Sequence, residues 1–112
     1  MKIEMRTVGD ARILDVSGQI TLGEGTMVIR NTVRDVIQTG VKKIILNLAD
    51  VTYIDSSGVG ELVSTYTTVV NNGGQLKLLN LTKRIREILT LTKLLTVFDV
   101  SDNEQAMLAG FK

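Results

Sequence analysis

The stretch of residues 51–63 constrains the fold of this chain more than any other segment. A short apolar run at 51–54 ends in an acidic residue, two serines and a glycine. Apolar residues then recur at the i, i+3, i+4 and i+7 spacing of a single helix face: Val59, Leu62, Val63, Tyr66, Val69 and Val70. The stretch therefore predicts a strand, a sharp turn at Asp55, Ser56 and Ser57, and the start of a helix.

The side chains at this turn have two roles open to them. Aspartate and serine before a helix most often act as caps, because their oxygens accept hydrogen bonds from the free N–H groups of the first turn. The same N–H groups carry about half a positive charge and can bind an anion, including a phosphate esterified to a serine. One cap would suffice, yet three capping residues precede Gly58 and Gly60. Because glycine leaves the backbone uncovered, we expect both glycines to admit a partner or a phosphate.

Length and composition predict one globular domain in the cytoplasm. With 112 residues, 44% of them hydrophobic and 22% charged, the chain can form one core and has an ordinary composition. A net charge of +1 gives no reason to expect nucleic acid or a membrane surface as a partner. The sequence lacks an apolar run of about 18 residues. Charges at residues 1–6 occupy the place where a signal peptide has its apolar core.

The absence of histidine and cysteine limits the chemistry of the chain. Without them it cannot form a Ser-His-Asp or Cys-His catalytic group, a Cys/His zinc site or a disulfide. The chain also lacks tryptophan, which does not favour stacking on single-stranded nucleic acid. An enzyme could use Ser56 as nucleophile with Lys42 or Lys43 as base, but no nucleophile-elbow pattern is present. We therefore expect a protein that is not an enzyme and that needs no cofactor and no metal.

The remaining segments predict alternating strands and helices. We expect strands at 2–8, 11–17, 41–48, 75–81 and 94–100. Residues 51–54 are expected to be the end of a connection rather than a full strand. Helices are expected between the later strands, one ending at Gly40 and one starting at Thr82. A capping box of Ser101 and Glu104 predicts a terminal helix.

This order of elements predicts an α/β fold in which helices pack on a mixed sheet. In an open α/β sheet the functional crevice lies beyond the carboxyl ends of the strands. The turn at 55–60 follows such an end, so we expect the functional site there.

Basic residues gather on two of the predicted helices. Arg30 and Arg34 lie one turn apart and share a face, and Lys83, Arg84 and Arg86 form a second group. We expect a solvated face in both cases. For Arg30 and Arg34 the alternative is a contact patch.

The segment Tyr-Ile-Asp-Ser-Ser-Gly-Val-Gly at 53–60 closely resembles the phosphorylation loop of bacterial anti-sigma factor antagonists, which are small members of the STAS family. Residues 16–20, 43–48 and 73–76 resemble other parts of the same domain, so the resemblance covers essentially the whole chain. It implies a STAS-like single domain at 1–112, with a mixed β-sheet and helices packed mainly on one face.

The resemblance also implies a mechanism called partner switching. The unphosphorylated antagonist binds an anti-sigma factor that is also a serine kinase, which then releases its sigma factor or phosphorylates the antagonist. A metal-dependent serine phosphatase removes the phosphate. The first serine of the loop is the phosphoacceptor, which corresponds to Ser56. Asp55 and Glu61 would repel the added charge of about −1.5 to −2, and binding would be lost through charge and bulk.

A partner-binding surface around the phosphoacceptor is a further implication of the resemblance. It consists of Thr21, Asp55, Ser57, Gly58, Val59 and Gly60. Many members of the family carry an aspartate where this chain has Thr21, which is either a plain loop residue or a second phosphosite. We expect Leu22 and Val59 to be exposed apolar residues beside the loop.

An alternative within the same family is a non-switching scaffold or a small-ligand-sensing module. A buried or tightly capped Ser56, or a sizeable apolar pocket, would favour that alternative. The residues carry no signal that distinguishes a monomer from a dimer.

Overall fold

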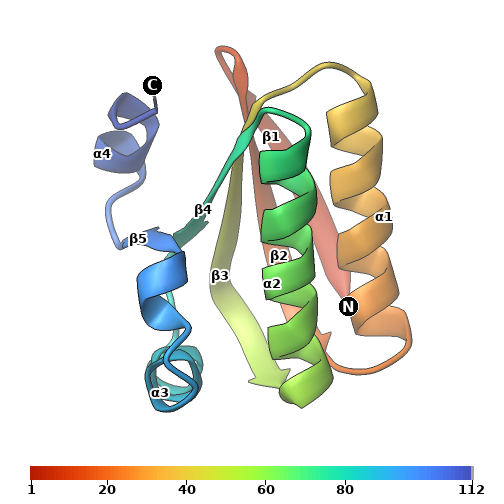
Figure 1. Cartoon of the computed structure of the whole chain (residues 1–112), viewed down its shortest axis with the longest axis vertical. Coiled ribbons are helices and arrows are strands. Elements are labelled where there is room, and N and C mark those ends of the chain that lie inside the picture. The colour runs from red at the N-terminus through yellow and green to blue at the C-terminus, as the bar shows by residue number, and fades with distance from the viewer. Residues whose placement is uncertain (112) are drawn as a thin grey trace.

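The computed structural model describes residues 1–111, which form one sheet with helices packed against it (Figure 1). Its elements in chain order are β1 (Lys2–Val8), β2 (Ala11–Ile20), α1 (Glu24–Gln38), β3 (Lys43–Ile54), α2 (Ser56–Asn71), β4 (Gln75–Leu79), α3 (Lys83–Leu91), the 3-10 turn η1 (Leu95–Val97), β5 (Asp99–Ser101) and α4 (Glu104–Ala109). Gly40 has a φ of 90°, which favours glycine, and it ends α1 as predicted.

The five described strands form a mixed sheet in the order β1-β2-β3-β4-β5. β1 pairs with β2 antiparallel, and every other neighbouring pair is parallel. Each parallel pair is joined by a helical connection: α1 after β2, α2 after β3, and α3 with η1 after β4. Figure 1 shows α1 and α2 side by side in front of the sheet. The arrangement confirms the predicted α/β fold.

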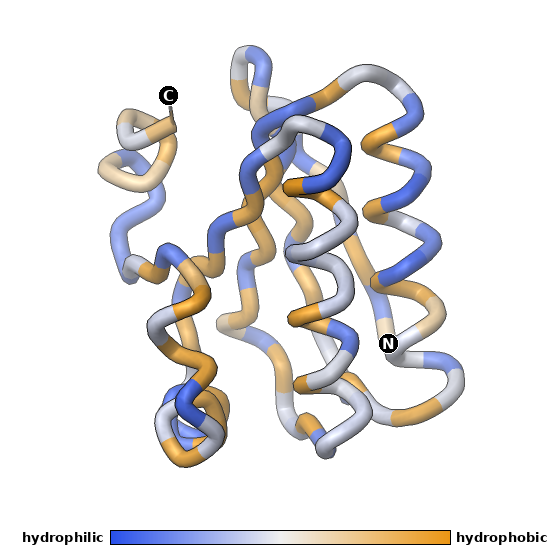
Figure 2. Tube along the Cα trace, in the orientation of Figure 1, coloured by the Kyte–Doolittle hydropathy of each residue, from blue (hydrophilic) through white to orange (hydrophobic). Residues whose placement is uncertain are grey.

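The main core lies between the sheet and the helices α1, α2 and α3. Side chains alternate along β3, so that Ile44, Leu46 and Leu48 join this core while Ile45 points to the opposite face. All four side chains are fully buried. In Figure 2 the apolar residues of α1 lie on the side toward α2. The prediction of a strand covered on both faces is therefore confirmed.

On the opposite face of the sheet, the short helix α4 packs against the strands. Ile13, Ile45 and Leu79 are buried there against Met107 of α4 and form a second, small apolar cluster. Because the other helices pack on the front, the helices lie mainly on one face, as predicted.

A network of polar side chains holds α4 against the sheet. The guanidinium of Arg6 on β1 donates from Nε to Asp15 at 2.6 Å and from Nη2 to Glu104 at 2.7 Å. Asn47 on β3 also donates to Asp15, at 2.9 Å. One arginine therefore joins β1, β2 and α4.

β3 runs unbroken to Ile54, so the prediction that residues 51–54 end a connection is wrong. The second half of β3 pairs with an extension of β2, ending with Ile20 beside Ile54. β4 stops beside Asn47, so beyond that point β3 has only one neighbouring strand. Asp50 reaches solvent there and interrupts the apolar pattern without ending the strand.

The C-terminal elements also differ from the prediction. The 3-10 turn η1 occupies residues 95–97 of the strand predicted at 94–100, and β5 begins only after Phe98. The ring of Phe98 is buried and meets the ring of Tyr66 edge-on at 5.5 Å. The cap of α4 is Asn103 rather than Ser101. Glu104 is therefore not part of a capping box, and it pairs instead with an arginine on β1.

Candidate functional site

The start of α2 is fixed by Asp55, the residue after β3. Its Oδ1 accepts the N–H of Gly58 at 2.8 Å, which makes Asp55 the N-cap of the helix. Its Oδ2 accepts the N–H of Leu22, in the connection between β2 and α1, at 3.3 Å. The Asp55 N–H donates to the carbonyl of Ile20 at 3.3 Å. One residue therefore joins the helix start to the neighbouring loop.

The two serines after this cap lie on different sides of the helix. Ser56 is exposed, and its hydroxyl makes no hydrogen bond within the described chain. It lines a hollow that faces α3. Ser57 is half-buried and lines a smaller hollow of 180 Å³ on the side of α1, together with Leu22. Ser56 is thus neither buried nor used as a cap, which are two of the three conditions that would favour a non-switching module.

Gly58 and Gly60 differ in their surroundings. A methyl group at Gly58 would lie 2.2 Å from the carbonyl oxygen of Ile20 and 2.6 Å from the side chain of Ile54. Gly58 is buried, so the expectation that it admits a partner is wrong. It allows α2 to pack closely on the ends of β2 and β3. Gly60 is exposed, and a methyl group there would have no neighbour within 4 Å. Gly60 alone fits the expected open backbone.

The hollow beside Ser56 lies between the first turn of α2 and helix α3. It has a volume of 530 Å³ and is lined by Tyr53, Ile54, Asp55, Ser56, Val59, Gly60, Arg84, Ile88 and Thr92. Arg84 is exposed, as predicted, but its position in the hollow beside Ser56 was not predicted. The i, i+4, i+8 spacing of Arg84, Ile88 and Thr92 puts them on one side of α3 and is the signal that could have grouped them.

The other predicted surface residues divide into exposed and buried ones. Leu22 is 78% exposed, which confirms the expectation of an exposed apolar residue beside the loop. Val59 is only 6% exposed, so the same expectation for Val59 is wrong, and its side chain joins the core. Thr21 is half-buried, and its carbonyl accepts the N–H of Thr26 at 3.1 Å. The bond between Leu22 and Asp55 brings the Thr21 region beside the helix start.

Glu61 is buried between α1 and α2. It is 4% exposed, and its Oε1 lies 2.6 Å from Nη2 of Arg30. Its Oε2 accepts the hydroxyl of Thr65 at 3.1 Å. The expectation that Glu61 repels a phosphate on Ser56 is therefore wrong, because its charge is paired on the other side of the helix. Arg30 and Arg34 are both exposed, as expected, but Arg30 also forms the ion pair with Glu61.

Lys42 and Lys43 lie at the opposite end of β3 from Ser56. Lys43 Nζ pairs with Asp10 at 2.9 Å, and Lys42 Nζ donates to the carbonyl of Asn72 at 2.5 Å. Because the whole length of β3 separates these amines from Ser56, neither can act as a base for its hydroxyl.

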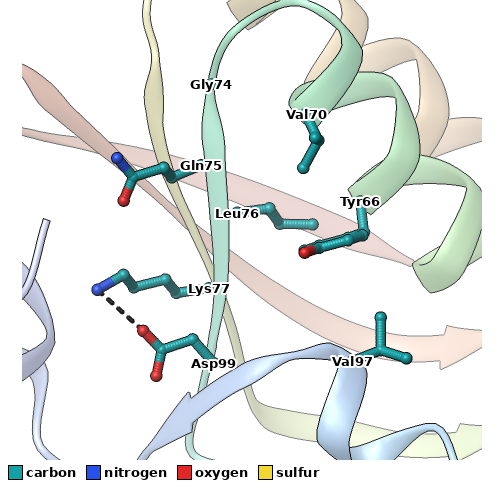
Figure 3. Close-up of a pocket in the computed structure, with 8 residues that line it drawn as sticks. All are labelled: Tyr66, Val70, Gly74, Gln75, Leu76, Lys77, Val97 and Asp99. Carbon is teal, nitrogen blue, oxygen red and sulfur yellow. Dashed lines mark ion pairs between the residues drawn. The ribbon is translucent and has the colours of Figure 1, made fainter. Parts of the chain in front are cut away.

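A further hollow, of 210 Å³, lies near the C-terminal end of α2 (Figure 3). Figure 3 shows that Leu76 of β4 points toward Tyr66 and Val70, whereas Lys77 points the other way. Lys77 pairs with Asp99 at 3.0 Å. The hollow is small and lies away from the start of α2, so it is not part of the candidate site.

None of the described helices is long and apolar enough to cross a lipid bilayer. Residues 1–111 contain no group of three or more acidic side chains placed to hold a metal ion. The groups around the start of α2 are hydroxyls, carboxylates and guanidiniums.

The sheet order, the helical cover and the capped serine turn together define a STAS domain. The STAS domain family model matches residues 2–107, and the chain belongs to this family. The same fold is found in the Bacillus cell fate determinant SpoIIAA, whose structure was solved in the phosphorylated form. The two share 21% identity with a TM-score of 0.73, over 96% of this chain and 98% of SpoIIAA.

Two further relatives are more similar to this chain. The anti-sigma-B factor antagonist of Bacillus subtilis (strain 168) is 43% identical over 54 residues, which is 48% of this chain and 50% of that protein. The match thus spans half the length of that relative. A crystal structure of a candidate anti-sigma factor antagonist from Thermotoga maritima is 25% identical with a TM-score of 0.86, over 96% of this chain and 92% of that one.

Proposed function

We propose that this chain is a cytoplasmic anti-sigma factor antagonist. In its unphosphorylated form it binds an anti-sigma factor with serine-kinase activity. Phosphorylation of Ser56 by that kinase ends the binding, and a metal-dependent serine phosphatase restores it. The chain itself is not an enzyme, acts without a cofactor and binds neither nucleic acid nor membrane.

The observation that carries this proposal is the exposed hydroxyl of Ser56 at a rigid helix start. A kinase needs a hydroxyl that can enter its active site, and Ser56 is exposed without an internal hydrogen bond in the described chain. The backbone beneath it is held by the contacts of Asp55 to Gly58 and Leu22. A serine presented on a fixed backbone can be modified without unfolding the loop.

The partner-binding surface that we propose surrounds Ser56 on α2 and the adjacent loop. Leu22 and Ser57 line the smaller hollow, Val59 lines the larger one, and Gly60 lines both. Thr21 directly precedes Leu22 in the adjacent loop. Asp55 and Gly58 contribute by fixing the loop rather than by touching the partner. A phosphate would add about −1.5 to −2 charge to this surface.

Internal repulsion of that phosphate is weaker than the sequence suggests. Both carboxylate oxygens of Asp55 already accept backbone N–H groups, and Glu61 pairs with Arg30. We therefore infer that phosphorylation acts on the contact with the partner, through charge and bulk, rather than on the fold of the antagonist. Two relatives support this proposal: one is named an anti-sigma-B factor antagonist, and SpoIIAA has been solved in a phosphorylated form.

The test is phosphorylation by the anti-sigma factor kinases of the source cell. Each kinase is incubated with the chain and ATP, the phosphate is located by mass spectrometry, and binding is measured by calorimetry. Ser57→Ala is the matched control for Ser56→Ala, because it removes a hydroxyl one position away on the other side of α2. Ser56→Asp tests the effect of charge.

We expect phosphate on Ser56 in the parent chain and in Ser57→Ala, and none in Ser56→Ala. Unmodified chain should bind the kinase, and Ser56→Asp should bind it at least tenfold more weakly. Absence of both kinase binding and phosphate would contradict the proposal. Phosphate on Thr21 would identify that residue as a second phosphosite.

One observation favours the alternative of a ligand-sensing module, namely the 530 Å³ hollow with its apolar floor. A stoichiometric small molecule that co-purifies with the chain and protects Ile88 and Val59 in hydrogen-exchange or NMR experiments would support that alternative. We favour the antagonist, because Ser56 stands exposed at the rim of this hollow.

A further inference from the structure

Arg84 is the one cationic residue in the lining of the hollow beside the proposed phosphoacceptor. It reaches from the first turn of α3 into the hollow that Ser56 also lines. Its guanidinium makes no ion pair or hydrogen bond within residues 1–111. By contrast, Arg6 pairs with Asp15 and Glu104. The guanidinium of Arg84 is therefore free to bind an anion that enters the hollow.

We propose that Arg84 binds the phosphate of phosphorylated Ser56 across this hollow. The inference rests on the proposed phosphorylation of Ser56, and it assigns a residue that positions the phosphate once it is attached. A guanidinium presents paired donors that match two phosphate oxygens, which makes arginine suited to this contact.

The charges around the hollow favour this pairing. Its charged lining residues are Asp55 and Arg84, and Tyr53 is the other ionisable one. The carboxylate of Asp55 is held by the N–H groups of Gly58 and Leu22 and does not neutralise Arg84. A phosphate on Ser56 would thus be the strongest anion available to this guanidinium.

The neighbouring serine has no equivalent cation. Ser57 shares its smaller hollow with Arg30, but Arg30 donates from both Nε and Nη2 to the buried carboxylate of Glu61. Moving Arg30 to a phosphate would leave that carboxylate buried without its partner, which is costly. The structure therefore favours a phosphate on Ser56 over one on Ser57.

The contact would change the shape of the surface as well as its charge. Arg84 and the phosphate would approach each other from opposite sides of the hollow and cover the apolar floor formed by Val59 and Ile88. A partner that inserts a side chain there would meet a closed surface. By closing the hollow, the contact between Arg84 and the phosphate would add to the loss of partner binding that phosphorylation causes.

The experiment uses the full chain with phosphoserine installed at position 56 by genetic encoding, so that no kinase is needed. Phosphorus NMR follows the second pKa of the phosphoserine in the parent and in two variants, Arg84→Gln and Arg86→Gln. Arg86 is the matched control, because it is exposed on the same helix, carries the same charge and does not line the hollow. Circular dichroism checks that each variant is folded.

We expect the second pKa to be lower by about half a unit in the parent and in Arg86→Gln than in Arg84→Gln. The Nε–Hε signal of Arg84 in the parent should shift on phosphorylation, and this readout does not depend on any variant folding. Equal pKa values in all three proteins with no shift of the Arg84 signal would overturn the inference. An equal rise of the second pKa in Arg84→Gln and Arg86→Gln would also overturn the inference, since it would show only a general effect of removing a positive charge.

This result is independent of the kinase assay. A chain that no kinase modifies can still show the Arg84 contact, in which case only the proposed function fails. If the kinase phosphorylates Ser56 but Arg84 does not contact the phosphate, the proposed function stands and this inference fails.

Discussion

Gly58 and Gly60 are two positions apart on the same helix, yet their surroundings are opposite. Gly58 packs against the backbone of Ile20, and Gly60 faces solvent. The sequence predicts the same open backbone for both glycines, because both follow the serine turn and nothing in the local pattern separates them. The difference arises from the contact of α2 with β2, whose residues lie far away along the chain.

Substitution of these two glycines by alanine should therefore have opposite effects. Gly60→Ala should raise the free energy of unfolding by about 0.5–1 kcal/mol, because alanine favours helix and meets no neighbour. Gly58→Ala should lower it by about 1–3 kcal/mol, because the new methyl group overlaps the carbonyl of Ile20. Urea unfolding of both variants checks this, and equal effects would contradict the packing described here.

Glu61 gives a second prediction at the scale of a residue. Arg30→Ala should lower the free energy of unfolding by about 1–3 kcal/mol, since it leaves a buried carboxylate without its cation. The half-exposed Arg30 side chain allows water to replace part of the contact, which keeps the loss moderate. Arg34→Ala is the control, and its effect should be within about 0.5 kcal/mol. If both arginine variants lose the same stability, the pairing with Glu61 contributes nothing specific.

At the scale of the elements, local patterns predicted the type of each main helix and strand but not every boundary. The central strand was correctly expected to be apolar on both sides, because Ile44 and Ile45 are consecutive and both buried. Its continuation to Ile54 was not predicted, since the exposed Ala49 and Asp50 interrupt the apolar pattern after Leu48. The cap at Asn103 was not predicted, because Glu104 forms an ion pair with Arg6 instead of completing a capping box with Ser101. Arg6 and Glu104 are far apart in the sequence, so the local pattern does not reveal this contact.

The Arg6 network should give the protein a specific acid sensitivity. The hydrogen bond from Arg6 holds the pKa of Asp15 below its usual value, with a smaller effect from Asn47. A lowered folded-state pKa means that this stabilisation is fully present above the unfolded-state pKa of about 3.9 and is lost as the pH falls through the folded-state value. Asp15→Asn should therefore be less stable than the parent above about pH 4, and this difference should shrink below it.

Urea unfolding between about pH 2.5 and pH 6 measures this difference. Asp102→Asn is the control, because Asp102 is exposed and makes no ion pair in the described chain. A stability difference for Asp15→Asn that stays constant across this range would show that the carboxylate does not contribute through its charge.

At the scale of the whole molecule, the sheet separates two apolar regions of unequal size. The front region holds α1, α2 and α3 and includes the base of the candidate site, whereas the rear region holds only α4. The sequence predicted helices mainly on one face through resemblance. It could not predict which helix lies on the other face, because the amphipathic pattern of a helix does not specify the side of the sheet on which it packs.

Met107→Ala tests this separation. It should lower the free energy of unfolding by about 2 kcal/mol, because it opens a cavity against Ile13, Ile45 and Leu79. It should increase hydrogen exchange in α4 while kinase binding and phosphorylation of Ser56 stay unchanged. Met27→Ala, at an exposed position on α1, should have little effect on stability. Loss of kinase binding in a folded Met107→Ala protein would show that the two regions are coupled.

The contrast between Gly58 and Gly60 also separates two kinds of selection. Gly58 is required by the fold, so drift should leave it in place in any relative that keeps α2 against β2, whatever its partner. Gly60 lowers helix stability and is not required by packing, so we expect it to be kept only where a binding surface needs a bare backbone. A lineage that lost the proposed anti-sigma partner would be expected to replace Gly60 first, and such a replacement would be a sign of that loss.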